Sequence, residues 1–262
     1  MKIKRYRLRK KYRILLKKYA KLFFVVLLLL GVFHLGKVMY RNFFDKDENQ
    51  EIAKIQEETK NDTPEKEKEP TIDVIIDAGH GGRDPGCEWD IVMEKHITLD
   101  ISRQVTKKLE SLGYTVYMTR TEDTDFAEIE DYDLIERVKI GEQIKPKLFV
   151  SIHVNFSEYE DPTGCETFYN SEKQFAAKAA QSIASSMDVS GILPSRGASE
   201  TKPYSPIYIV DYNSCESVLI ETAFLSNPND RQVLCTPFKR VEIANVIAQG
   251  IHESLNTTSK TE

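Results

Sequence analysis

Four residues with side chains that can bind a metal ion or move a proton stand next to apolar segments of the chain: His80, Glu94, His153 and Glu221. Two imidazoles and one carboxylate around a zinc ion leave the fourth position open for water, which is the composition of a catalytic site. A structural zinc site is usually closed by four protein ligands, often thiolates. A single histidine beside a strand is more often structural than a ligand, so the residue types alone do not decide between these uses.

The positions of the five histidines in the sequence indicate which of them are candidate metal ligands. His34 lies in an apolar N-terminal run, and His96 and His252 lie within predicted helices. Only His80 and His153 directly follow a predicted strand. These two are therefore the candidate imidazole ligands.

Apolar segments with strand and helix periods alternate from residue 71 onward. Predicted strands cover residues 72–77, 114–119, 148–152, 166–169, 207–210 and 218–220, and predicted helices cover 97–112, 133–144, 171–187 and 238–255. This alternation predicts an α/β fold, with a mainly parallel mixed sheet and helices on both faces. Reactive residues in such sheets gather at the carboxyl ends of strands, where His80, His153 and Glu221 are expected.

The N-terminal segment has a different composition. Residues 1–21 are rich in Lys and Arg and contain no Asp or Glu, and an apolar run follows over residues 22–40. A run of that length can cross a membrane as a helix, and the preceding positive charge predicts a cytoplasmic N-terminus and an extracytoplasmic remainder. The competing prediction is a cleaved signal peptide and a secreted protein, although no Ala-x-Ala site follows the run.

The expected layout thus has five parts. A basic cytoplasmic segment (1–21) and a transmembrane anchor (22–40) precede a charged linker (41–70), a single catalytic domain (71–256) and a disordered tail (257–262). The linker has too few apolar residues to fold alone and is expected to be a solvated stalk.

Charge and cysteine usage exclude two classes of function. The net charge is −5 although the N-terminal block is strongly basic, so the remainder is acidic and lacks the cationic surface that nucleic acid requires. Cys87, Cys165, Cys215 and Cys235 form no C-x-x-C pair, which gives a thiolate zinc site no support. Free thiols are the expected state, although export would permit disulfides.

A set of short motifs carries a family resemblance. In chain order the motifs are Asp77-Ala-Gly-His-Gly-Gly82, Asp84-Pro-Gly86, Glu94-Lys95, Arg120-Thr-Glu-Asp123, Ser151-Ile-His-Val-Asn155, Arg196-Gly197 and Glu221-Thr-Ala-Phe-Leu-Ser-Asn227. In this order and spacing they resemble the zinc-dependent N-acetylmuramoyl-L-alanine amidases with a type-3 catalytic domain, in a minimal layout similar to that of the spore-cortex type. Each motif alone is weak, but the ordered set is specific and extends from about residue 72 to 252.

The resemblance implies a mechanism. One Zn²⁺ would be held by His80, Glu94 and His153, and Glu221 would be the catalytic carboxylate. The substrate would be peptidoglycan, cut at the amide bond between N-acetylmuramic acid and L-alanine during wall turnover, cell separation or spore-cortex modification.

Three further residues are candidates for supporting roles. Asp77 is expected to orient His80, Arg196 to contact the oxyanion or a substrate carboxylate, and Asn155 to lie near the substrate. Two alternatives stay open: a non-catalytic or partner-dependent peptidoglycan-binding regulator on the same fold, and another zinc hydrolase of the wall, such as a carboxypeptidase or deacetylase. A protein activator is compatible with all of them.

Overall fold

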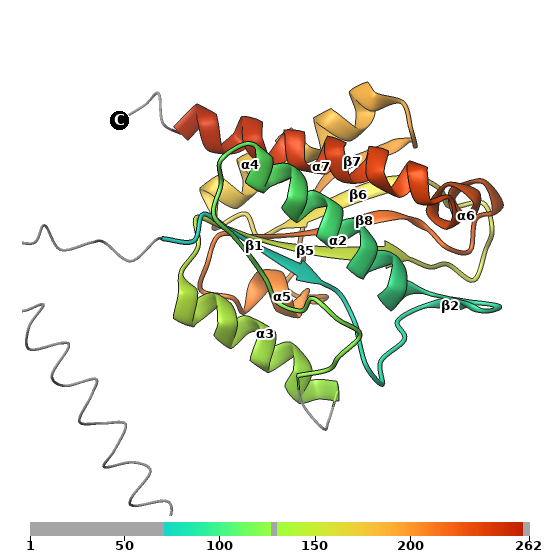
Figure 1. The fold of residues 1–262 in the computed structure, drawn as a ribbon, viewed down its shortest axis with the longest axis horizontal. Helices are drawn as coiled ribbons and strands as arrows, with labels where there is room; N and C mark the ends of the chain where they lie inside the picture. Colours follow the sequence, from blue (N-terminus) through green and yellow to red (C-terminus); the bar gives the residue numbers. More distant parts are fainter. Residues whose placement is uncertain (1–70, 127–129, 259–262) are drawn as a thin grey trace, which may run out of the picture. The chain divides into compact units, whose positions relative to one another are not determined.

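The computed structural model describes residues 71–126 and 130–258, which form an α/β structure around one central sheet (Figure 1). The strands are β1 (Val74–Ala78), β4 (Val116–Met118), β5 (Leu148–Asn155), β6 (Cys165–Tyr169), β7 (Ser195–Glu200) and β8 (Ser217–Phe224), in the sheet order β4-β1-β5-β8-β6-β7. Strands β4, β1, β5 and β8 are parallel, β6 is antiparallel to β8, and β7 is parallel to β6. The expected mainly parallel mixed sheet is confirmed.

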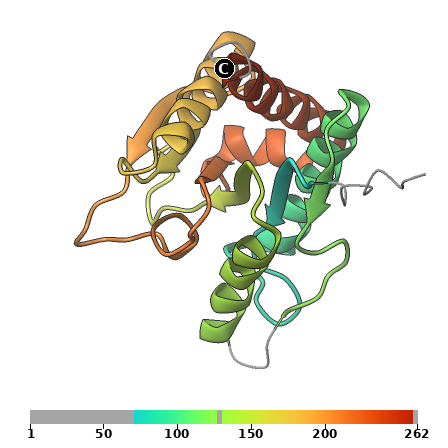
Figure 2. The ribbon, with the colours of Figure 1, turned by 90° about the vertical axis from the view of Figure 1, so that its left-hand side faces the viewer.

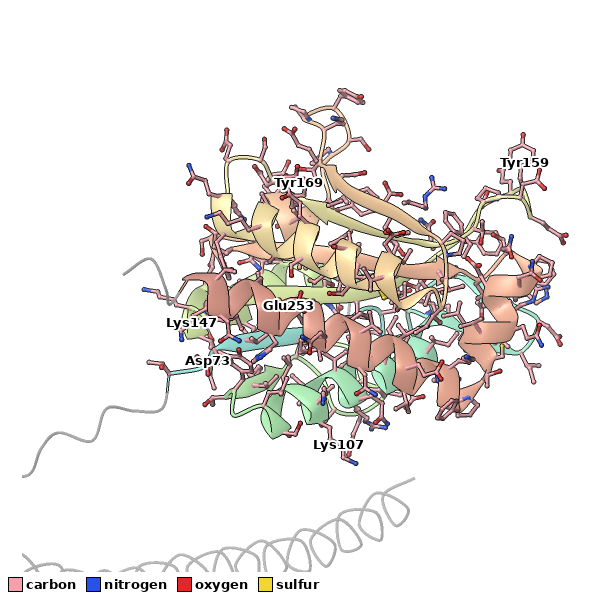
Figure 3. All side chains as sticks on the ribbon, turned by 90° about the horizontal axis from the view of Figure 1, so that it is seen from above. Asp73, Lys107, Lys147, Tyr159, Tyr169 and Glu253 are labelled. Atoms are coloured by element: carbon pink, nitrogen blue, oxygen red, sulfur yellow. The ribbon has the colours of Figure 1, made fainter. Side chains whose placement is uncertain are left out.

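Helices cover both faces of this sheet. Helices α2 (Glu94–Ser111), α4 (Gln174–Ser190) and α7 (Pro237–Thr258) lie on one face, and α3 (Glu130–Ile144) and α5 (Tyr208–Asp211) lie on the other (Figures 1 and 2). Seen from above, α4 and α7 run side by side over the sheet (Figure 3). Helix α6 (Pro228–Cys235) follows β8.

The two-faced burial explains why the central strands are continuous apolar runs. In β1, Val74 and Ile76 belong to the core cluster under α2, α4 and α7, whereas Ile75 packs with Val138 of α3 and with Phe149 on the opposite face. A strand covered on both sides has no solvent-facing side, so hydrophobic side chains occupy consecutive positions such as Val74, Ile75 and Ile76.

One predicted strand is wrong. Residues 208–210 belong to the one-turn helix α5, and Ile207 precedes it as the N-cap. The amide of Asp211 donates to the carbonyl of Ile207, and the Asp211 side chain accepts from the Ile207 amide at 2.7 Å. Ile209 and Val210 are buried as a strand would bury them. A run of four apolar residues is too short to show whether it forms a buried helix or a buried strand.

Three elements were missing from the sequence prediction: β7, α6, and a hairpin of β2 (Glu88–Trp89) and β3 (Val92–Met93). Strand β7 is a partly exposed edge strand with the sequence Ser-Arg-Gly-Ala-Ser-Glu, so it lacks an apolar alternation. Helix α6 did have a signal, because Asn227 caps it and Pro228 begins it.

The predicted anchor (22–40) and linker (41–70) lie outside the described residues. Within residues 71–126 and 130–258, no helix combines the length and apolarity needed to cross a membrane. At the other end, α7 continues to Thr258, two residues into the expected tail. All four cysteines are free thiols in the structure.

Candidate active site

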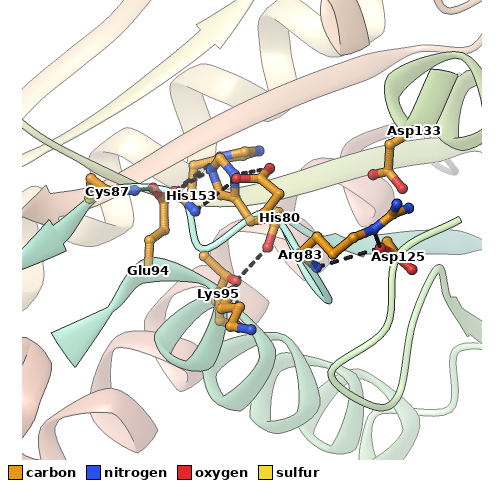
Figure 4. Close-up of polar contacts among 12 residues, drawn as sticks. His80, Arg83, Cys87, Glu94, Lys95, Asp125, Asp133 and His153 are labelled. Carbon is orange, nitrogen blue, oxygen red and sulfur yellow. Dashed lines mark hydrogen bonds and ion pairs between the residues drawn. The ribbon is translucent and has the colours of Figure 1, made fainter. Parts of the chain in front are cut away.

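Three side chains from separate elements converge at the carboxyl end of the sheet (Figure 4). His80 Nε2 lies 3.1 Å from Glu94 Oε1, and His153 Nδ1 lies 3.1 Å from the same oxygen and 3.2 Å from His80 Nε2. The two imidazole nitrogens and the carboxylate oxygen thus form a nearly equilateral triangle. The structure brings together all three predicted metal ligands.

The triangle fits a zinc ion. Ligand atoms about 2.0–2.1 Å from a tetrahedral zinc are separated from one another by about 3.3 Å, close to the three distances observed here. Two imidazoles and one carboxylate are also the donor set of catalytic zinc sites that keep one position open. His80, Glu94 and His153 therefore suit this metal in both chemistry and spacing.

His80 lies in the turn that leaves β1. Its backbone has a φ of 61°, in the left-handed region, and Gly81 and Gly82 follow with φ values of 134° and 57°. A non-glycine residue in this region is uncommon and costs conformational energy, which marks the turn as functionally constrained. The turn directs the imidazole back over the end of the sheet toward His153.

Glu94 begins α2 and is nearly buried. Its Oε1 accepts from the amide of Val154 at 2.8 Å, and its Oε2 accepts from the amide of Cys87 at 2.9 Å. Burial by itself would raise the pKa of Glu94, but hydrogen bonds and charge from His153 and His80 hold it far below its usual range. The carboxylate is therefore ionised and fixed in place.

The carboxylate that contacts His80 differs from the expected one. Asp84 Oδ2 lies 2.6 Å from His80 Nδ1, on the ring edge opposite the metal-facing nitrogen. Burial lowers the pKa of His80, but the hydrogen bonds and charges of Glu94 and Asp84 outweigh it and raise that pKa to about 9. Asp84 thus has the orienting position that the sequence prediction gave to Asp77, and its motif Asp84-Pro-Gly86 was the available signal.

Asp77 instead lies beneath the turn in a buried polar network. Its two oxygens accept from the hydroxyls of Thr119 at 2.7 Å and Ser151 at 2.6 Å, and Oδ1 also accepts from Arg137 at 2.6 Å. Arg137 was not predicted. It follows the helical pattern of α3, and nothing in the local sequence separates it from the exposed charged residues of that helix.

Glu221 lies in the middle of β8, beside His153 of β5 in the sheet register. Register partners face the same side of a sheet, so Glu221 lies next to the three ligands. Its Oε2 is buried and has no hydrogen-bond partner in the part of the chain that the structure describes. Burial, with the nearby charge of Glu94, raises the pKa of Glu221 to about 7. Such a carboxyl group is suited to exchange a proton near neutral pH.

The remaining candidates lie further along the same face. Arg196 Nε contacts Glu166 Oε2 at 3.1 Å, and its guanidinium lies 5.4 Å from the centre of the Phe224 ring. Glu166 is the register partner of Glu221 on β6, so Arg196 is linked to the site through Glu166. The side chain of Asn155 accepts from the amide of Phe156 at 2.8 Å, which is a local backbone contact.

Comparisons with known proteins show to which family this chain is related. A family model for N-acetylmuramoyl-L-alanine amidases matches residues 74–253, which include every element of the site. The chain belongs to this amidase family. The match covers the same stretch as the motif resemblance in the sequence, which is thereby confirmed.

Three curated proteins from Bacillus subtilis are similar to this chain. The amidase LytC is 32% identical over 182 residues, which cover 69% of this chain and 34% of LytC. The germination-specific N-acetylmuramoyl-L-alanine amidase is 31% identical over 186 residues, covering 68% of this chain and 77% of that protein. The uncharacterised YqiI is 35% identical over 180 residues, covering 68% and 82%. The chain thus spans about a third of the length of LytC and most of the length of the other two.

Solved structures agree with these matches. The CwlD amidase of Clostridioides difficile, in complex with the GerS lipoprotein, superposes with a TM-score of 0.65 at 31% identity and covers 71% of this chain and all of that chain. The catalytic domain of CwlV from Bacillus (Paenibacillus) polymyxa gives a TM-score of 0.63 at 30% identity and covers 71% and 99%.

Proposed function

We propose that this amidase hydrolyses the bond between N-acetylmuramic acid and L-alanine in peptidoglycan, with one zinc ion held by His80, Glu94 and His153. The observation that carries the proposal is the triangle of ligand atoms, with sides of 3.1–3.2 Å, beside the unpartnered carboxylate oxygen of Glu221. Binding without catalysis would not require a buried carboxyl group with a pKa near 7 at this position.

A bound zinc would polarise the amide carbonyl and lower the pKa of a coordinated water. Glu221 accepts the proton that the attacking water loses and passes it to the amine nitrogen of L-alanine as the C–N bond breaks. The products are the free lactyl carboxylate of the sugar and the free amino group of the stem peptide. The amides of Val154 and Cys87 hold Glu94 in place throughout, and Asp84 holds the ring of His80.

The deciding experiment digests purified peptidoglycan with the full chain and identifies the products by mass spectrometry. We expect free stem peptides that begin with L-alanine, and no release after zinc is removed. The variant Glu221→Gln should keep its zinc and lose hydrolysis by about 100-fold or more, because it can no longer accept a proton. Glu253→Gln, on the exposed side of α7, is the matched control and should retain activity.

The other outcomes of this digest identify the alternatives. Shortened stem peptides would indicate a carboxypeptidase. Glycan sugars that have lost their acetyl group would indicate a deacetylase. Peptidoglycan that is bound but never cut would indicate a regulator. Loss of zinc in Glu221→Gln, or full activity in that variant, would contradict the role of Glu221.

We also propose that residues 22–40 anchor the catalytic domain to the membrane, with residues 1–21 in the cytoplasm and the domain facing the wall. The basic block followed by an apolar run supports this topology. Fractionation with N-terminal sequencing tests it, since a cleaved signal peptide would leave a soluble, shortened protein. CwlD was solved in complex with the GerS lipoprotein, and a lipoprotein is a candidate partner here.

A further inference from the structure

The turn that carries His80 needs an external support. Three consecutive residues, His80, Gly81 and Gly82, have positive φ values of 61°, 134° and 57°. The two glycines tolerate these values, but His80 does not adopt its value readily, so contacts from the surrounding structure must hold it. These contacts decide where the first metal ligand points.

Arg137 of α3 supplies that support from below. Its Nη2 donates to the carbonyl oxygen of His80 at 2.7 Å, and its Nη1 donates to the carbonyl oxygen of Ala78 at 2.8 Å. One rigid guanidinium therefore contacts the backbone on both sides of Gly79, at the end of β1 and in the turn.

Arg137 is itself fixed by two carboxylates. Its Nε donates to Asp133 at 2.8 Å and its Nη1 to Asp77 at 2.6 Å, and the arginine side chain is only 2% exposed. Asp77 is held in turn by the hydroxyls of Thr119 and Ser151. The guanidinium thus has almost no freedom to move, and a fixed donor imposes a fixed position on the carbonyl that it contacts.

We propose that Arg137 is a positioning residue for the metal site, which holds the His80 turn in its left-handed conformation and thereby sets the zinc affinity. This proposal rests on the proposed function, because it takes zinc as the ion at His80, Glu94 and His153. It also gives Asp77 a role: Asp77 acts on His80 through Arg137 and not by direct contact.

Arg137→Lys tests the proposal. Lysine keeps the positive charge beside Asp77, but a single ammonium group cannot reproduce the fork that reaches Asp133, Asp77 and the His80 carbonyl together. We expect zinc affinity, measured by competition with a chromogenic chelator, to fall about 10- to 100-fold. The visible absorption spectrum of the cobalt-substituted protein should change as well, because it reports the geometry of the ligands.

Val138→Ala is the matched control. Val138 is the next residue of α3 and packs in the core with Ile75 and Phe149, away from the turn. Its truncation should lower the Tm while leaving zinc affinity within about twofold of the parent protein and the cobalt spectrum unchanged. Comparison of the two variants separates a loss of fold stability from a loss of ligand positioning.

A second variant keeps the proposal testable if Arg137→Lys does not fold. Asp133→Asn removes the charge that holds Arg137 Nε at the edge of the network, where Asp133 is 14% exposed. It should reduce zinc affinity in the same direction but by less. Unchanged affinity and spectrum in both variants, or an equal affinity loss in Val138→Ala, would overturn the role of Arg137. A parent protein that binds no zinc would instead overturn the proposed function and this inference with it.

Discussion

At the scale of single residues, the site depends on close approaches that only small side chains permit. A Cβ atom on Gly79 would lie 2.5–2.7 Å from the ring atoms of His153, which is far inside van der Waals contact. The ring of His153 therefore packs directly on the backbone that leads to His80. The two ligands are coupled through this contact as well as through any shared ion.

Gly79→Ala should displace the His153 ring, because the added Cβ would overlap with the ring atoms. We expect zinc affinity to fall at least tenfold and the free energy of unfolding to fall by about 1–3 kcal/mol, as for other overpacked sites. Isothermal titration with zinc and urea denaturation measure the two effects.

Gly113→Ala is the control for this variant. Gly113 follows α2 with a φ of 90°, and an added Cβ would meet nothing within 4 Å. Alanine there should cost stability through backbone strain and leave zinc affinity unchanged. Equal zinc affinity in Gly79→Ala and the parent would contradict the steric argument.

At the scale of elements, parallel strands bring His80, His153 and Glu221 together, and helices pack over both faces of the sheet. Strands β1, β5 and β8 end at the same edge and supply His80, His153 and Glu221. Helices α4 and α7 pack against each other and meet at Gly250, where an added Cβ would lie 2.6 Å from the Cα of Ile183. The helices approach this closely because α7 has a glycine at the crossing.

Gly250→Leu should force α4 and α7 apart and lower the free energy of unfolding by about 1–3 kcal/mol or more. Thermal denaturation measures the effect. The control is Gln249→Leu, one position along the same helix on its exposed side, which should change stability little. A Gly250→Leu variant as stable as the parent would show that the helices can separate at no cost.

At the scale of the whole domain, buried charge makes stability depend on pH. The Asp77 carboxyl is fully buried, and although burial alone would raise its pKa, the charge of Arg137 and the hydroxyls of Ser151 and Thr119 hold that pKa below its ordinary value. A carboxyl whose pKa is lower in the folded state stabilises that state above its unfolded pKa of about 3.9. This contribution is lost as the pH falls through the folded pKa.

We therefore expect the contribution of Asp77 to the free energy of unfolding to be constant near neutral pH and to decrease below about pH 4. Asp77→Asn should be less stable than the parent by about 3 kcal/mol at pH 7, because Arg137 is then buried without its main counter-charge. Urea denaturation between pH 7 and pH 3 should show this gap narrowing as the parent carboxyl becomes protonated. A gap that stays constant over this range would contradict the assignment.

Much of the fold could be predicted because, in the core, the residues that are apolar in the sequence pattern are also the residues that the structure buries. The apolar runs of β1, β5 and β8 are buried on both faces and were predicted as strands, and the helical pattern of α2 is equally clear. The secondary-structure prediction failed at α5 and β7, which are short or partly exposed. A four-residue apolar run and a polar edge strand contain too little periodicity to identify their conformation.

The family and the motifs that contain His80, Glu94, His153 and Glu221 could be read from the sequence, because each motif is a short run of neighbouring residues and the family match covers the same stretch. Only the tertiary structure decided that Asp84 contacts His80, that Asp77 acts through Arg137, and that Arg196 pairs with Glu166. Each of these ionisable side chains has several polar or oppositely charged residues that it could contact. Which partner it meets depends on distances of a few tenths of an ångström, and those distances are set by how strands and helices pack.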